Sequence, residues 1–258
     1  MTGLRPAPAG DVDYEAGGGG YADHRRPDPR IAGRVHAALG AARTVVNVGA
    51  GAGSYEPRDR HVVAVEPSAA MRAQRPSGLA PAVDATAERL PFDDRAFDAA
   101  MATVTIHQWA DRDRGLRELR RVARGPVVIL TFDGDELDRL WLGGYVEGMT
   151  AAESARLPAI DHVRAVLGGT SVVEEVPVPF DCTDGFTEAY YGRPERFLDR
   201  GVRRSQSAWN FVDPAAARRG IESLERDLAT GAWDARFGVL RTQPEFVGAL
   251  RLIVAQPT

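Results

Sequence analysis

A glycine-rich loop and an acidic side chain stand where they could bind a nucleoside. A short apolar, β-branched run ends at Val48 and is followed directly by three alternating glycines, Gly49, Gly51 and Gly53. Such a run is typical of a strand buried in a parallel sheet, and the glycines allow a tight turn with its backbone close to a ligand. Glu66 closes a second apolar run, where a carboxylate can bind both ribose hydroxyls. Together the loop and the acid predict a nucleotide or nucleoside site.

The spacing of the glycines narrows the class of ligand. A dinucleotide fold needs the pattern G-x-G-x-x-G, in which the third glycine lets a helix pack close while its N-terminus meets a pyrophosphate. This chain has G-x-G-x-G instead, and only the seven residues 54–60 separate Gly53 from the second strand. We therefore expect a ligand without phosphates, and a loop or a very short helix in place of the usual crossover helix.

Further motifs follow the two strands in order. They are Ala87-Glu88-Arg89-Leu90-Pro91-Phe92, Phe97-Asp98 and the apolar strand 127–132. With the glycine loop and Glu66, this series resembles the class I S-adenosylmethionine-dependent methyltransferases over about residues 21–133. It is most similar to the small-molecule enzymes that include the ubiquinone-biosynthesis type. The resemblance implies S-adenosyl-L-methionine as cofactor and S-adenosyl-L-homocysteine as product.

The resemblance also assigns residues to the cofactor. In such sheets the ligand lies outside the carboxyl ends of the strands, so the loops at those ends supply the contacts. The assigned residues are Tyr21, Arg26, Gly49, Ala50, Gly51, Gly53, Glu66, Pro67, Ser68, Met71, Thr86, Ala87, Glu88, Ala102 and Thr103. Thr86 departs from the family pattern, because an aspartate is common there. Arg25 and Arg26 could bind a carboxylate through their guanidinium groups, although a solvated charge pair explains them equally well.

His107 is the candidate catalytic residue. It follows the expected strand 98–104, and by resemblance His107 and Trp109 face the methyl acceptor. An unperturbed imidazole has a pKa near 6.5, so it could accept a proton from an acceptor at neutral pH. The alternative is a structural histidine that hydrogen-bonds the backbone and shapes its loop.

Aromatic residues crowd the second half of the chain. Nine of the 19 aromatic side chains fall between residues 180 and 237. We predict that they form a concave apolar wall for the substrate, while the alternative is a small separate core. The predicted substrate-binding residues are His107, Trp109, Trp141, Tyr190, Tyr191, Trp209 and Phe211.

Composition excludes several classes of protein. The 258 residues carry a net charge of −4 and include no lysine, so a Schiff-base lysine, a pyridoxal phosphate attachment and a Walker loop are impossible. The net charge gives no sign of a basic surface for nucleic acid. The sequence also lacks an apolar run of the kind found in a membrane span or a secretion signal, so we expect a cytoplasmic protein. Cys182 is the single cysteine, which excludes an intramolecular disulfide. No metal site is expected, since the strand before His107 ends in Ala and Thr rather than an acid.

The elements that must position these residues alternate between strands and helices. Asp28 and Pro29 begin a helix before the first strand, Ser68 and Asp111 or Asp113 begin later ones, and this alternation implies a parallel sheet. By resemblance the fold is α/β, a doubly wound, Rossmann-like, mostly parallel seven-stranded sheet. Its antiparallel edge is expected from 171–180 and 246–255. An α-helical, aromatic-rich cap insertion would cover about residues 181–240.

These expectations define a domain plan and a function. Residues 1–20 are expected to be a flexible leader, and 21–258 a single domain with its cofactor-binding core at 21–133 and its C-terminal part at 134–258. The function expected is methyl transfer to a small, apolar or aromatic molecule, by a monomer or homodimer without nucleic acid or membrane partners. There are three alternatives. The first is an enzyme of the same fold that binds the cofactor but catalyses another reaction, such as a cyclase. The others are a nicotinamide oxidoreductase and a non-catalytic binding module.

Overall fold

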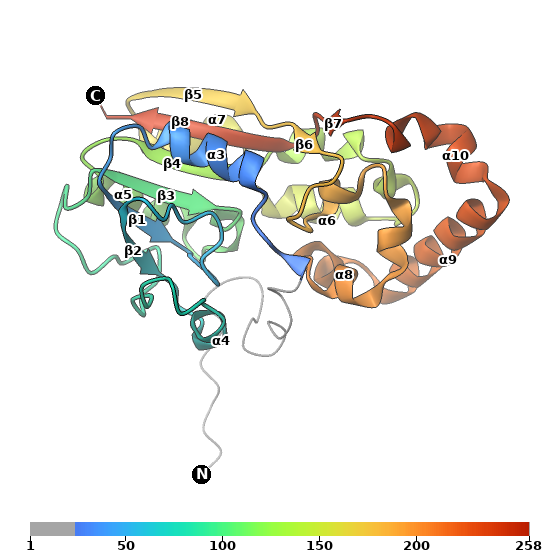
Figure 1. Cartoon of the computed structure of the whole chain (residues 1–258), viewed down its shortest axis with the longest axis horizontal. Coiled ribbons are helices and arrows are strands. Elements are labelled where there is room, and N and C mark those ends of the chain that lie inside the picture. Colours follow the sequence, from blue (N-terminus) through green and yellow to red (C-terminus); the bar gives the residue numbers. More distant parts are fainter. Residues whose placement is uncertain (1–23, 258) are drawn as a thin grey trace, which may run out of the picture.

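A six-stranded mixed sheet forms the centre of the computed structural model, which describes residues 24–257 (Figure 1). Its strands are β1 (Thr44–Val48), β2 (His61–Val65), β3 (Ala99–Thr103), β4 (Val127–Phe132), β5 (Thr170–Glu175) and β8 (Leu250–Gln256), in the order β2-β1-β3-β4-β8-β5. Strands β1 to β4 are parallel, and β8 runs antiparallel to both β4 and β5. The predicted doubly wound sheet with an antiparallel edge is confirmed. The predicted leader, residues 1–20, lies outside the described residues.

The predicted number of strands, seven, is wrong, because the sheet has six within residues 24–257. Beyond β2 the chain forms a single parallel bridge between Val65 and Val83 where a seventh strand would lie. Val83 donates its N–H to the Ala64 carbonyl and accepts from the Glu66 N–H. The preceding segment contains Pro76, Gly78 and Pro81, and proline cannot donate to a strand ladder, so pairing does not extend.

Both predicted edge strands are interrupted. The expected strand 171–180 divides into β5 and β6 (Val178–Pro179), and 246–255 divides into β7 (Glu245–Phe246) and β8. Strands β6 and β7 pair with each other in a separate antiparallel sheet. In the turn 247–249 between β7 and β8, the Ala249 N–H donates to the Glu188 side chain instead of to a strand.

Helices cover both faces of the sheet. They are α3 (Pro29–Ala38), α4 (Ala69–Ala73), α5 (Arg112–Val122), α6 (Met149–Arg156), α7 (Ile160–Leu167), α8 (Arg200–Arg204), α9 (Pro214–Thr230) and α10 (Ala232–Phe237). Helix α3 packs Ile31 and Val35 on one face, whereas α5 and α7 pack on the other, because alternate strand residues point to opposite faces. Asp28, Ser68 and Asp111 cap α3, α4 and α5 as the sequence predicts.

A third apolar cluster lies outside the two faces. Figure 1 shows α8, α9 and α10 at one end of the molecule, beyond the carboxyl end of β3. Their apolar side chains pack with Trp141, Leu142, Tyr191 and Phe246 into one buried cluster. The cap insertion is thus helical and has its own core. Between residues 24 and 257, no helix combines the length and the apolar character that a membrane span requires.

Candidate functional site

The glycine loop, residues 49–53, turns sharply after β1. Gly49, Gly51 and Gly53 have φ angles of +71°, +53° and +95°, a region that side chains rarely adopt. A Cβ atom at Gly49 would lie 2.2 Å from Thr105 Oγ1. Only glycine therefore fits here, and its absent side chain lets the loop pack directly on the segment after β3.

Glu66 is held at the end of β2 by the glycine loop itself. Its Oε2 accepts from the Gly51 N–H at 2.8 Å and its Oε1 accepts from the Ser68 N–H at 2.9 Å. Burial raises the pKa of Glu66, while the N–H groups of Ser68 and Gly51 act in the opposite direction. A carboxylate has about four lone-pair positions, so each oxygen retains room for one further donor. The residue suits a pair of ribose hydroxyls.

A buried ion pair supports the loop from beneath. Arg75 donates to both carboxylate oxygens of Glu56 at 3.0 and 2.9 Å, and the side chains are only 4% and 2% exposed. Asn47, in β1, donates to Glu56 Oε1 at 3.0 Å, and Arg75 also donates to the Ala80 carbonyl. These contacts connect β1, the segment after the glycine loop and the segment after α4.

The other residues assigned to the cofactor lie around this loop in several ways. Met71 is buried, and its Cε lies 3.3 Å from where a Gly51 Cβ would stand. Ala50, Ala87 and Ala102 are buried, whereas Pro67, Thr86 and Thr103 are partly buried. Ser68 accepts from the Met71 N–H, and Glu88 accepts from the Asp111 N–H at 3.2 Å. Arg26 is exposed, and Tyr21 lies outside the described residues.

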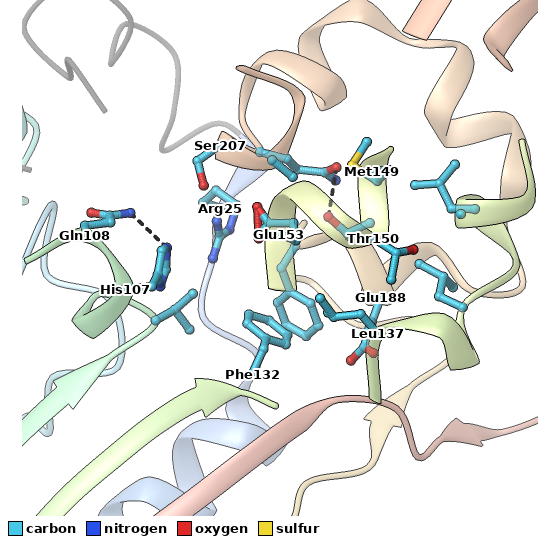
Figure 2. Close-up of a pocket in the computed structure, with 18 residues that line it drawn as sticks. Arg25, His107, Gln108, Phe132, Leu137, Met149, Thr150, Glu153, Glu188 and Ser207 are labelled. Carbon is cyan, nitrogen blue, oxygen red and sulfur yellow. Dashed lines mark hydrogen bonds between the residues drawn. The ribbon is translucent and has the colours of Figure 1, made fainter. Parts of the chain in front are cut away.

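A pocket opens beside His107, between the sheet and the cap insertion (Figure 2). We call it the apolar pocket. Its lining residues are Arg25, Val104, His107, Gln108, Phe132, Leu137, Leu140, Leu142, Gly143, Met149, Thr150, Glu153, Phe186, Thr187, Glu188, Gln206, Ser207 and Ala208. Figure 2 shows His107 and Gln108 on one side and Leu137, Thr150 and Glu188 on the other. The arrangement fits an apolar molecule with a few polar groups.

His107 does not have the titration behaviour expected from its sequence. Burial, and then the charges of Arg156, Arg112 and Arg25, lower the pKa of His107 to about 3. Its Nδ1 has no hydrogen-bond partner within residues 24–257, and its Nε2 lies 3.4 Å from Gln108 Nε2. The imidazole is therefore neutral at neutral pH and suited to hydrogen bonding. Its role as a base stays a prediction.

Glu188 is a second buried titratable group of the apolar pocket. Burial raises the pKa of Glu188 to about 7, against the effect of the Ala249 N–H and the Arg251 charge. Oε1 accepts from the Ala249 N–H at 2.7 Å, while Oε2 has no partner in the described part of the chain. The two ends of the pocket thus carry a histidine that resists protonation and a carboxyl that resists ionisation.

The aromatic residues predicted to bind substrate do not line the apolar pocket, and a substrate role for them stays a prediction. Trp109, Trp141, Tyr190, Tyr191, Trp209 and Phe211 are absent from the pocket lining. Trp141 donates to the Tyr191 carbonyl at 2.7 Å, and the Tyr191 ring stacks on Phe246. Trp209 donates to Gln206, and Arg156 covers the ring of Phe211. Trp141, Tyr190, Tyr191 and Trp209 pack in the separate core that the sequence left as the alternative. Trp109 packs against the sheet instead, and Phe211 is 38% exposed.

Several pocket residues escaped the sequence analysis. Phe132, Leu137, Met149 and Glu188 come from four separate segments, whereas Phe186 is one of the nine aromatic residues that the sequence placed in a substrate wall. One signal was present, since Glu188 is an acid between the aromatic residues Phe186 and Tyr190. Within residues 24–257, no three histidine, cysteine, aspartate or glutamate side chains gather as metal ligands would.

Comparisons with known proteins relate this chain to methyltransferases. A family model described as a methyltransferase domain matches residues 46–129. An uncharacterised methyltransferase of Mycobacterium tuberculosis (strain H37Rv) is 38% identical over 205 residues, which cover 74% of this chain and 75% of the relative.

Two further comparisons differ in the share of the chain that they cover. The crystal structure of a proposed methyltransferase from an antibiotic biosynthesis pathway of Anabaena variabilis superposes with a TM-score of 0.83 at 27% identity, and covers 90% of this chain and 98% of that one. The ubiquinone/menaquinone biosynthesis C-methyltransferase of Citrifermentans bemidjiense is 46% identical over 50 residues, 19% of this chain. The alignment spans 21% of that enzyme's length.

Proposed function

Because the chain belongs to the class I S-adenosylmethionine-dependent methyltransferases, we propose that it methylates a small, largely apolar molecule bound in the apolar pocket. The observation that carries the proposal is the position of the loop after β3. Thr105 packs on Gly49 of the glycine loop, and His107, two residues later, lines the apolar pocket. One short segment therefore touches both the cofactor side and the pocket.

The cofactor side is suited to a nucleoside with a charged amino-acid end. The glycine loop offers close backbone approach, Glu66 offers two carboxylate oxygens, and Met71 offers an apolar surface. When bound, S-adenosylmethionine supplies a methyl group that is already electrophilic. The chain's own contribution is then alignment and exclusion of water, and alignment can lower a barrier by about 7–11 kcal/mol.

The apolar pocket would hold the acceptor beside His107. Phe132, Leu137 and Met149 give it hydrocarbon walls against which a largely apolar molecule can bury its surface. We propose that neutral His107 orients the acceptor by a hydrogen bond, rather than removing its proton. An imidazole with a pKa of about 3 is a weak base at neutral pH. The cytoplasmic location and the monomeric or homodimeric state remain predictions from the sequence.

Calorimetry with S-adenosylmethionine and S-adenosylhomocysteine tests the cofactor side. Glu66→Gln is expected to weaken binding about 10- to 150-fold, because hydrogen bonds to a charged group contribute about 1.5–3 kcal/mol. Glu225→Gln, an exposed change on α9, is the matched control. Binding of NADH without binding of either sulfur nucleoside would overturn the proposal.

Turnover tests the acceptor side. The full chain with methyl-labelled S-adenosylmethionine, offered a panel of small phenols, amines and apolar acids, is expected to label at least one of them. His107→Gln should then lower kcat/KM about 10- to 100-fold without removing a limb of the pH–rate profile near pH 7. Loss of such a limb would show that His107 acts as a base after all.

A further inference from the structure

A buried hydrogen-bond network connects the end of the glycine loop to the wall of the apolar pocket. The Tyr55 hydroxyl donates to Asp184 Oδ2 at 2.6 Å, and Arg25 Nε donates to Asp184 Oδ1 at 2.5 Å. Tyr55 is 3% exposed, and the side chains of Arg25 and Asp184 are 10% and 2% exposed. Hydrogen bonds to a carboxylate in such surroundings are short and strong, so the network fixes the three side chains relative to one another.

Tyr55 is held in an unusual backbone conformation at the loop end of this network. It lies two residues after Gly53, and its φ angle is +62°, in the left-handed region that a bulky side chain rarely occupies. Its carbonyl oxygen lies 2.9 Å from His36 Nε2, while its hydroxyl is bound by Asp184. Strain of this kind persists only where the surroundings enforce it. The direction of the Tyr55 ring thus depends on the backbone conformation of the glycine loop.

Asp184 is equally well connected to the pocket. Arg25 and Asp184 form an antiparallel bridge, and the Gly185 N–H donates to the His24 carbonyl at 2.9 Å. Arg25 itself lines the apolar pocket, and so do the three residues 186–188 that follow. A displacement of Asp184 therefore moves both sides of that wall.

We propose that Asp184 is a positioning residue that transmits cofactor occupancy of the glycine loop to the wall of the apolar pocket. The inference rests on the proposed function, which assigns the loop to the cofactor and the pocket to the acceptor. Cofactor binding fixes the glycine loop and Tyr55, Tyr55 fixes Asp184, and Asp184 fixes Arg25 and the segment 184–188. The acceptor then meets a formed wall only when the cofactor is present. Coupling between two such sites typically amounts to a 5- to 150-fold change in affinity.

Hydrogen exchange of the full chain, with and without saturating S-adenosylhomocysteine, tests this proposal without a known acceptor. In the wild type, the ligand is expected to slow exchange both in the glycine loop and in 184–188. Tyr55→Phe removes only the hydroxyl, so it should bind S-adenosylhomocysteine within about 3-fold of the wild type and keep the protection of the loop. The ligand-induced protection of 184–188 should be lost.

Tyr145→Phe is the matched control. The Tyr145 hydroxyl donates to Asp227 Oδ2 at the same distance of 2.6 Å, but this bond joins residue 145 to helix α9 of the cap insertion, away from the glycine loop. This variant should keep both ligand-induced changes. Asp184→Asn should behave as Tyr55→Phe does, and if it does not fold, Tyr55→Phe decides alone.

The outcomes separate the inference from the proposed function. If wild-type protein binds neither S-adenosylmethionine nor S-adenosylhomocysteine, the proposed function fails and the inference falls with it. If the ligand binds but leaves exchange in 184–188 unchanged, the inference alone is overturned. It is also overturned if Tyr55→Phe retains the protection of that segment, because the network would then be only a structural contact.

Discussion

The glycine loop and the apolar pocket are built in opposite ways. The loop depends on its backbone conformation and on the buried ion pair of Glu56 with Arg75, both of which lie within residues 47–80. The pocket is assembled from single side chains of segments as distant as Arg25 and Ala208. We therefore expect a substitution near the loop to lower the free energy of unfolding, whereas a substitution in the pocket wall can change which ligand binds without changing the fold.

The largest effect is expected for Arg75→Met. Removing one partner of a buried ion pair leaves the Glu56 carboxylate uncompensated, which typically costs about 3–5 kcal/mol in the free energy of unfolding. Arg117→Met is the control, since that side chain is 65% exposed and should change stability by less than about 0.5 kcal/mol. Urea unfolding of both variants measures the difference. A loss below about 1 kcal/mol for Arg75→Met would mean that the pair does not support the loop.

Gly49→Ala should have the next largest effect. The new methyl group would overlap Thr105 Oγ1 at 2.2 Å and would also force alanine into a φ angle of +71°. We expect a loss of about 2–3 kcal/mol and much weaker cofactor binding. Thr105→Ala removes the overlapping atom, so the double variant should recover part of the loss in a double-mutant cycle. Strictly additive effects would contradict the packing of this loop on the segment after β3.

Tyr191→Phe tests the cap insertion with a smaller change. The Tyr191 hydroxyl donates to the Gln243 carbonyl at 2.6 Å, so its removal should cost about 1 kcal/mol of stability. Turnover and acceptor KM should stay within about 2-fold, because the residue belongs to a core and not to the apolar pocket. A large rise in KM with unchanged stability would restore Tyr191 to the substrate site that its sequence suggested.

The same contrast explains which features the sequence could predict. Ser68 and Asp111 accept from N–H groups three residues away, and Glu66 accepts from the Ser68 N–H two residues away and from the Gly51 N–H 15 residues away. Their spacing was therefore sufficient to predict the loop, the acid and the helix caps. The role of Arg25 depends on an antiparallel bridge to Asp184, a separation of 159 residues that no local pattern encodes.

Aromatic residues show a different limit. An aromatic ring buries a large apolar area wherever it packs, so the composition of the cap insertion could not distinguish a core from a pocket wall. Tyr191 and Trp141 lie in the core of the cap insertion, whereas Phe132 and Phe186 line the apolar pocket. The last two rings pack edge to face with their centroids 5.5 Å apart. His107 shows the same limit for electrostatics, because its pKa is lowered first by burial and then by the charges of arginines that include Arg156 and Arg25 from distant segments.

The smallest effect is expected in the pH dependence of wild-type stability, where the two ends of the apolar pocket oppose each other. The pKa of His107 falls from 6.5 to about 3 on folding, so the unfolded chain binds more protons between these values and stability rises with pH. The pKa of Glu188 rises from 4.5 to about 7, so the folded chain binds more protons there and stability falls with pH. From pH 4.5 to 6.5 the two contributions nearly cancel.

Each single variant should reveal the pH dependence that the other group contributes. The stability of His107→Asn should fall as pH rises, and that of Glu188→Gln should increase, each by about 1 kcal/mol per pH unit. Urea unfolding across this range, with the exposed His61→Asn as control, measures both slopes. Equal slopes in the two variants would contradict the opposed environments of the two groups.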